Sequence, residues 1–138
     1  MKVYLGTDGR QGYKACENIA SLSQQILEAE ATEIYCDRFL SKHNFQDVPK
    51  VLELICSKIR TNGNLIIHDN DFQMISRQIF REDTELELLN SYVFPMTNSV
   101  MKCMLNLNIV KELLPSNFEM YKANYGSHTF LMELRRIK

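Results

Sequence analysis

The chain lacks both a long apolar segment and an N-terminal targeting signal. No apolar run approaches the roughly 20 residues with which a helix crosses a bilayer. The first segment, MKVYLGTDG, turns polar after Leu5 and therefore has no signal-peptide core. We expect a cytoplasmic protein with no membrane partner.

A charge excess is also missing. The formal net charge is -1, and the 16 basic residues are scattered except for Arg135, Arg136 and Lys138 at the end of the sequence. This balance does not indicate a nucleic-acid partner. Hydrophobic residues make up 45% of the chain and charged residues 24%, which is typical of an ordinary globular protein.

Metal-binding and disulfide patterns are absent from the sequence as well. The three histidines show no HExxH or similar spacing. The cysteines lie far apart and form no CxxC pair: Cys16, Cys36, Cys56 and Cys103. This spacing favours reduced, structural thiols and predicts no metal site.

No internal repeat, low-complexity tract or linker rich in Pro, Gly and Ser divides the chain. At 138 residues, we expect a single domain over residues 1–138 with one hydrophobic core. Nothing in the sequence indicates an oligomeric state.

Residues 32–72 carry the clearest structural pattern, and they predict strand, helix and strand in that order. Ile34–Phe39 is rich in residues that favour extended structure. A helix then starts after Asp47, which can cap it, with Pro49 in its first turn. Its predicted buried stripe has helical spacing: Val48, Val51, Leu52, Ile55 and Ile59.

The end of that segment predicts where a ligand would bind. Asn62-Gly63 supplies the left-handed residue that commonly ends a helix. Leu65–Ile67 is an apolar run without alternation, which is typical of a strand covered on both faces. Together the elements form a βαβ unit, which implies a parallel sheet and a ligand crevice at the carboxyl ends of its strands.

The N-terminal part is less clear. Lys2–Leu5 and Tyr13–Cys16 read as short strands. Because only seven residues lie between Leu5 and Tyr13, fewer than a parallel crossover normally needs, the segment taken alone resembles a hairpin that turns at Asp8-Gly9. Ile19–Ala29 fits a helix, or else contains a short strand at Gln24–Leu27.

The C-terminal half predicts helices and then a hairpin. We expect helices over Phe72–Phe80, Thr84–Val93 and Asn108–Leu114, the last stopped by Pro115. The final segment reads as two strands around a turn at Asn124–Ser127. The expected fold class is therefore α/β, with a mostly parallel sheet finished by an antiparallel hairpin.

Five short segments carry a family resemblance. In order they are Leu5–Gly9 (LGTDG), Gly12–Glu17 (GYKACE), Glu33–Cys36 (EIYC), Thr61–Gly63 (TNG) and Asn70–Phe72 (NDF). They resemble, over essentially the whole chain, the LGCG, GYxNVD, EIYxxHVLEH, PGG and PDF motifs of a compact subgroup of class I S-adenosylmethionine-dependent methyltransferases. The resemblance implies a minimal Rossmann-like methyltransferase fold, S-adenosylmethionine as cofactor, and methyl transfer to a small molecule or glycan.

The resemblance also implies a set of cofactor-binding residues. Gly6, Thr7 and Gly9 would form the loop that the methionine part of the cofactor approaches, since larger side chains would block it. Glu17 lies where the family has an acidic residue that accepts the ribose hydroxyls. The alternative for Glu17 is a solvated carboxylate at a strand end.

Two departures support an alternative in which the chain is a degenerate, inactive binding or interaction module. Asp8 replaces the second glycine of the loop, where it would repel the carboxylate of the cofactor or receive its amino group. After Cys36, where the subgroup continues to HVLEH, the chain reads DRFLSK, and only the leucine of that motif is kept. Asp37 would contact the cofactor amine, or else pair with Arg38 or Lys42. A nicotinamide cofactor is disfavoured, because no GxGxxG is present.

Strand-end residues supply candidates for a general base. They are Asp37, His68, Asp69 and Asp71. His68 best fits the role, because unperturbed histidine titrates near neutral pH, although a structural role is the alternative. Asp71 precedes a predicted helix and is expected to cap it. In the apolar stretch Tyr92–Leu107, the methionines would cover the site, form a dimer contact or pack in the core: Met96, Met101 and Met104.

Overall fold

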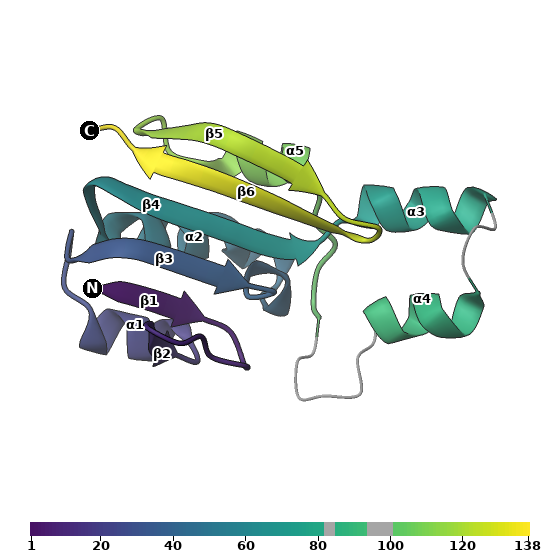
Figure 1. The fold of residues 1–138 in the computed structure, drawn as a ribbon, viewed down its shortest axis with the longest axis horizontal. Coiled ribbons are helices and arrows are strands. Elements are labelled where there is room, and N and C mark those ends of the chain that lie inside the picture. The colour runs from purple at the N-terminus through teal and green to yellow at the C-terminus, as the bar shows by residue number, and fades with distance from the viewer. Residues whose placement is uncertain (82–84, 94–100) are drawn as a thin grey trace.

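A computed structural model describes residues 1–81, 85–93 and 101–138 (Figure 1). Its sheet has six strands in the order β2-β1-β3-β4-β6-β5. The strands are β1 Lys2–Leu5, β2 Lys14–Cys16, β3 Ala31–Asp37, β4 Ile59–Asn70, β5 Phe118–Tyr125 and β6 Thr129–Arg136. The helices are α1 Ile19–Gln25, α2 Val48–Lys58, α3 Phe72–Arg81, α4 Leu86–Val93 and α5 Leu107–Leu113.

The strand directions confirm the predicted fold class. Strands β1 to β4 pair in parallel, and β6 runs antiparallel between β4 and β5. The predicted hairpin is present, and its turn is closed by a hydrogen bond from the Gly126 amide to the Thr129 carbonyl at 2.8 Å. The sheet is thus mostly parallel, with an antiparallel C-terminal part.

The hairpin interpretation of the N-terminus is wrong. Strand β2 lies parallel to β1, with Val3 opposite Lys14 and Leu5 opposite Cys16. The connecting loop reverses the chain without a helix because Gly9 and Gly12 both adopt left-handed backbone angles, with φ of 73° and 84°.

Between β2 and β3 the helical alternative is confirmed, and the short strand at Gln24–Leu27 is wrong. Helix α1 covers Ile19–Gln25. Asn18 caps it, because its side-chain oxygen accepts a hydrogen bond from the Ser21 amide at 2.8 Å.

Helix α2 confirms the predicted amphipathic helix but ends earlier than expected, at Lys58. Asp47 occupies its N-cap position without a side-chain capping bond. Asn62-Gly63 lies inside β4 instead of ending the helix. There the pairing register with β3 shifts, since Ala31 pairs with Ile59 but Glu33 pairs with Asn64. The left-handed Asn62, with φ of 65°, therefore belongs to a bulge.

The later helices fall close to their predicted positions. Helix α3 extends to Arg81, and α5 starts at Leu107, capped by Asn106. Helix α4 runs from Leu86, while the predicted start at Thr84 lies outside the described residues, as does Met96. Of the other two methionines, Met101 is half-buried and Met104 is exposed. No helix in the described ranges is long and apolar enough to cross a membrane.

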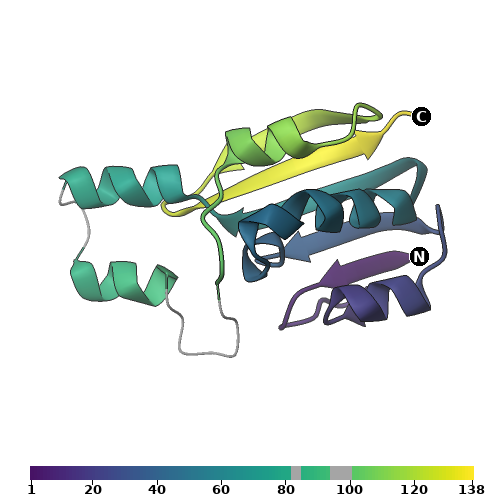
Figure 2. The same cartoon turned by 180° about the vertical axis from the view of Figure 1, so that it is seen from behind.

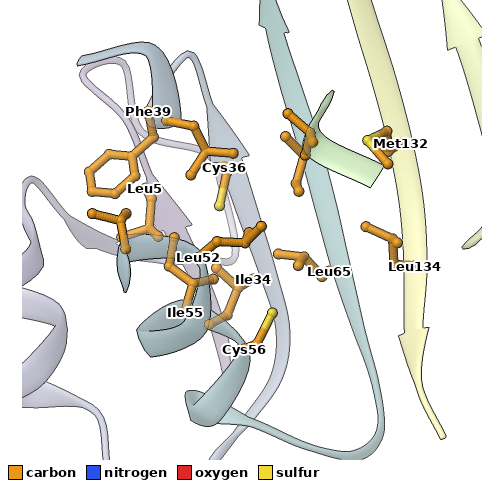
Figure 3. Close-up of a cluster of buried hydrophobic side chains, with 14 of the residues drawn as sticks. Leu5, Ile34, Cys36, Phe39, Leu52, Ile55, Cys56, Leu65, Met132 and Leu134 are labelled. Carbon is orange, nitrogen blue, oxygen red and sulfur yellow. The ribbon is translucent and has the colours of Figure 1, made fainter. Parts of the chain in front are cut away.

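The core lies on one face of the sheet. Helices α1, α2 and α5 all cover this face (Figure 2). Side chains from α2 meet those of the central strands in a close-packed cluster that includes Leu5, Ile34, Leu52, Leu65 and Leu134 (Figure 3).

On the opposite face, no helix of the described residues packs against the sheet (Figures 1 and 2). The burial of β4 alternates accordingly: Leu65 and Ile67 are buried, whereas Ile66 and His68 are half-buried. The expectation that this strand is covered on both faces is therefore wrong. Helices α3 and α4 extend beyond the edge where the parallel strands end (Figure 1).

Candidate functional site

The carboxyl ends of the parallel strands bring the predicted site residues to one edge. Leu5 is opposite both Cys16 and Cys36, so Gly6 and Glu17 directly follow the paired ends of β1 and β2, and Asp37 is the last residue of β3. Asp37 is in turn opposite His68 of β4. This row lies where a parallel sheet presents its ligand crevice.

The start of the loop after β1 is tightly packed, and the rest of it is exposed. Gly6 is buried, and a Cβ atom there would lie 2.8 Å from Cε1 of Tyr4 and 3.0 Å from the Asp37 carbonyl oxygen. Thr7, Asp8 and Gly9 are exposed. A Cβ on Gly9 would meet no atom within 4 Å, so the backbone there is open to an approaching ligand.

Asp37 is held by two side chains. Its Oδ2 accepts a hydrogen bond from the Tyr4 hydroxyl at 2.5 Å, and its Oδ1 lies 3.0 Å from His68 Nδ1. These partners replace the pairing predicted with Arg38 or Lys42. Burial raises the pKa of Asp37, but the hydrogen bonds from His68 and Tyr4 and the nearby positive charges outweigh it, so the pKa is lowered.

Tyr4 is the residue of this group that sequence reasoning missed. It is buried, and burial together with its hydrogen bond to Asp37 raises the pKa of its phenol. Its ring stacks on Tyr35, with centroids 5.8 Å apart. The signal available in the sequence was the alternation in β1, where Lys2 and Tyr4 face away from the core that Val3 and Leu5 enter.

A second tyrosine–carboxylate pair lies on the same face of β3. The Tyr13 hydroxyl donates a hydrogen bond to Glu33, which also pairs with Lys2 at 3.5 Å. Burial and this hydrogen bond raise the pKa of Tyr13 to about 12. The Arg10 guanidinium lies 4.6 Å from the ring centroid of Tyr35 and 5.5 Å from that of Tyr13. The loop after β1 is thereby fixed against the uncovered face of the sheet.

Glu17 is exposed immediately after β2 and precedes the Asn18 cap of α1. Its carboxylate lies in solvent at the same edge as Gly6. This placement suits a residue that accepts hydrogen bonds from a ligand arriving from outside.

Asp69 and Asp71 have structural roles. Asp71 Oδ1 accepts a hydrogen bond from the Met74 amide at 3.0 Å, which confirms the predicted cap of α3, and Oδ2 accepts one from the Leu107 amide at 3.2 Å. Asp69 accepts bonds from the backbone amides of Ser41 and Asn70. Burial raises the pKa of Asp69 despite these bonds.

The cysteines are free and buried: Cys16, Cys36, Cys56 and Cys103. Burial raises the pKa of Cys56 to about 12 and that of Cys103 to about 11, so these thiols are poor nucleophiles at neutral pH. Within ranges 1–81, 85–93 and 101–138, no group of three or more His, Cys, Asp or Glu side chains could hold a metal ion.

Comparison with known proteins identifies the fold through structure and not through sequence. No family model matches the chain, and no curated protein matches it in sequence. Solved structures do match, among them magnesium protoporphyrin IX methyltransferase from Synechocystis PCC 6803 with bound SAH, at a TM-score of 0.56 and 12% identity. That alignment covers 90% of this chain and 50% of the other.

Two further neighbours agree. The CurJ carbon methyltransferase aligns at a TM-score of 0.58 and 12% identity over 92% of this chain and 35% of that one. A SAM-dependent methyltransferase from Archaeoglobus fulgidus aligns at 0.55 and 9% identity over 90% of this chain and 68% of that one.

The chain has the Rossmann-like fold of class I S-adenosylmethionine-dependent methyltransferases. It spans half or less of the length of the first two of these neighbours, at 50% and 35%. At 9% to 12% identity these likenesses show the fold alone.

The strand ends present open backbone and carboxylates at this edge. Gly9 leaves open backbone, Glu17 offers an exposed carboxylate, and Asp37 supplies a fixed one. Gly6 has a second explanation, since the contacts with Tyr4 and the Asp37 carbonyl already require a glycine there.

Proposed function

We propose that the chain binds S-adenosylmethionine at the carboxyl edge of β1, β2 and β3 and transfers its methyl group to a small molecule or glycan. The observation that carries this proposal is that Gly6, Glu17 and Asp37 each follow one of three paired residues, Leu5, Cys16 and Cys36, at the carboxyl edge of a methyltransferase fold.

Each residue would have a distinct part in holding the cofactor. The loop residues Gly6, Thr7 and Gly9 would face its methionine part through their backbone. Glu17 would accept hydrogen bonds from the ribose hydroxyls. Asp37 would accept the amine through the lone pairs that Tyr4 and His68 leave open, since a carboxylate has about four acceptor positions.

The bound cofactor would supply an already activated methyl group, so little other chemistry is required of the protein. The chain would have to hold the acceptor in line with the methyl group and exclude water. Gly6, Tyr4 and Asp37 are in close contact with one another, and they would form a fixed surface next to the acceptor and the methyl group.

The alternative is a degenerate fold that serves as a binding or interaction module. It is favoured by Asp8, which stands where relatives have a glycine, and by the sheet face that no described helix covers. Such a module would keep the fold and show no affinity for the cofactor.

Calorimetric titration with S-adenosylmethionine and S-adenosylhomocysteine separates the two functions. We expect saturable binding of both, weakened by about 1–3 kcal/mol in Glu17→Ala, because the ribose would lose hydrogen bonds to a charged group. Glu112→Ala, an exposed carboxylate of α5, is the matched control and should bind as the wild type does. Absence of heat and of thermal shift at millimolar ligand would favour the inactive module.

A further inference from the structure

His68 and Asp37 form a hydrogen-bonded pair at the proposed site. Asp37 Oδ1 lies 3.0 Å from His68 Nδ1, and the two side chains are 24% and 25% exposed. Both side chains are therefore partly accessible to solvent. A carboxylate at this distance selects the imidazole tautomer that carries its proton on Nδ1. The lone pair then lies on Nε2, the nitrogen that Asp37 does not engage.

Tyr4 fixes the carboxylate from its other side. Its hydroxyl donates to Asp37 Oδ2 at 2.5 Å, and its ring is clamped between Tyr35 and Gly6. Since both oxygens of Asp37 are held, the imidazole plane of His68 is set by groups on three adjacent strands. Such support from a second layer is what orients a histidine that moves protons.

On the assumption that the proposed function is right, we propose that His68 is the proton acceptor for a hydroxyl-bearing methyl acceptor, with Asp37 and Tyr4 as its positioning residues. The bond between the acceptor oxygen and the methyl carbon forms while the bond between methyl carbon and sulfur breaks. The electron pair of that bond returns to the sulfur, which becomes an uncharged thioether. The hydroxyl proton passes to His68 Nε2, and Asp37 stabilises the resulting imidazolium.

The pair bears on the class of acceptor. A hydroxyl is a weak nucleophile until its proton is removed, so a positioned base accelerates its attack. A neutral amine attacks with its own lone pair and needs no base before the bond forms. The histidine–carboxylate pair therefore favours a methyl acceptor with a hydroxyl group, such as a glycan.

Other charged groups lie near His68. The carboxyl groups of Asp37 on β3 and Asp69 on β4 interact electrostatically with it. His128, in the turn between β5 and β6, has a lowered pKa because of burial and of the positive charges of Arg38 and His68.

The orientation of the pair is tested without any ligand. Nitrogen-15 NMR of the histidine side chains should show neutral His68 protonated on Nδ1. Asp37→Ala should remove this preference, because the acceptor of the Nδ1 proton is lost. Glu33→Gln is the matched control, since Glu33 is also a carboxylate of β3 bonded by a tyrosine, and it should leave the tautomer of His68 unchanged. A neutral His68 protonated on Nε2 would overturn the proposal.

Catalysis is tested with His68→Asn, whose amide can still donate to Asp37 but cannot accept a proton. With labelled S-adenosylmethionine, we expect methyl transfer to catechol or methyl glucoside but not to benzylamine. The rate should fall on the order of 100-fold or more in the variant. Affinity for S-adenosylhomocysteine should be unchanged.

The outcomes distinguish this inference from the proposed function. If calorimetry shows no cofactor binding, the proposed function fails. The NMR result still shows whether His68 is hydrogen-bonded to Asp37 through Nδ1. If the cofactor binds, the hydroxyl inference is overturned by transfer confined to the amine or by no transfer to either hydroxyl probe. It is also overturned by a His68→Asn rate equal to that of the wild type.

Discussion

Gly6 and Gly9 are glycines for different physical reasons. Gly6 is required by space, since a Cβ atom would strike the Tyr4 ring and the Asp37 carbonyl. Gly9 has open space but a left-handed φ of 73°. Asparagine can replace Gly9, because it adopts left-handed angles more readily than other residues with a side chain. It cannot replace Gly6, because the space there does not admit a side chain.

We therefore predict that asparagine leaves stability unchanged at position 9 and lowers it at position 6. Gly9→Asn should remain near wild-type stability, whereas Gly6→Ala should lose about 1–3 kcal/mol through overpacking and Gly6→Asn more than that. Urea unfolding of the three variants measures this. Equal losses at both positions would contradict the packing described around Gly6.

The half-buried carboxyl group of Asp37 and the buried one of Asp69 should respond to pH in opposite directions. The folded pKa of Asp37 is lowered, so its stabilisation is present above its unfolded pKa and is lost as pH falls through the folded value. The folded pKa of Asp69 is raised by burial, so its ionisation opposes folding, and stability is lost as pH rises through that value.

We predict that Asp37→Asn loses less stability than the wild type as the pH falls. Asp69→Asn should lose less stability than the wild type as the pH rises through the range in which carboxyl groups ionise. Free energies of unfolding between about pH 3 and 7 test it. Identical pH profiles in the two variants would show that the carboxylates do not differ in environment.

For single residues, the sequence predicted which of them lie at the sheet edge but not which side chains they contact. Glu17 and Gly9 follow strands that were predicted, so their place at the edge could be foreseen. The contact of Tyr4 with Asp37 could not, because it joins β1 to β3 across 33 positions and depends on the register of their pairing.

At the scale of elements, Asp71 joins two helices to the end of β4. One oxygen caps α3 through the Met74 amide, and the other accepts the Leu107 amide at the start of α5. This single side chain therefore fixes a helix of the core layer relative to one that extends beyond the sheet edge (Figure 1).

Loss of this joint should cost more than loss of an ordinary cap. We predict that Asp71→Ala destabilises the fold by about 2–4 kcal/mol, because one buried and one half-buried amide lose their acceptor. Asn106→Ala, which removes one cap of α5, is the matched control at about 1 kcal/mol. Thermal and urea unfolding compare them, and equal losses would mean that Asp71 serves only one helix.

Elements with a strong period were predictable, and those defined by a single local signal were not. The stripe of α2 and the strands of the hairpin were found because apolar spacing reports burial directly. Asn62-Gly63 was misread because a left-handed residue serves equally in a helix end and in a bulge. The apolar run Leu65–Ile67 predicted a strand covered on both faces, so it did not indicate that one face of the sheet is uncovered.

At the scale of the molecule, the order of elements carried the fold prediction. The βαβ unit and the final hairpin predicted a mostly parallel sheet with an antiparallel end, and the resulting fold matches methyltransferase structures that share only 9% to 12% of their residues with this chain. Function was less predictable, because it depends on a few side chains whose positions follow from strand register.

Amide NMR shows directly whether the cofactor binds at the carboxyl edge of β1, β2 and β3. On titration with S-adenosylhomocysteine, we expect saturable shifts at Gly6, Gly9, Glu17 and Asp37. Amides near Glu53 and Asn117, which line a cavity of about 210 Å³ away from that edge, should not move. Shifts confined to the latter region, or no shifts at saturating ligand, would show that the cofactor does not bind at this edge.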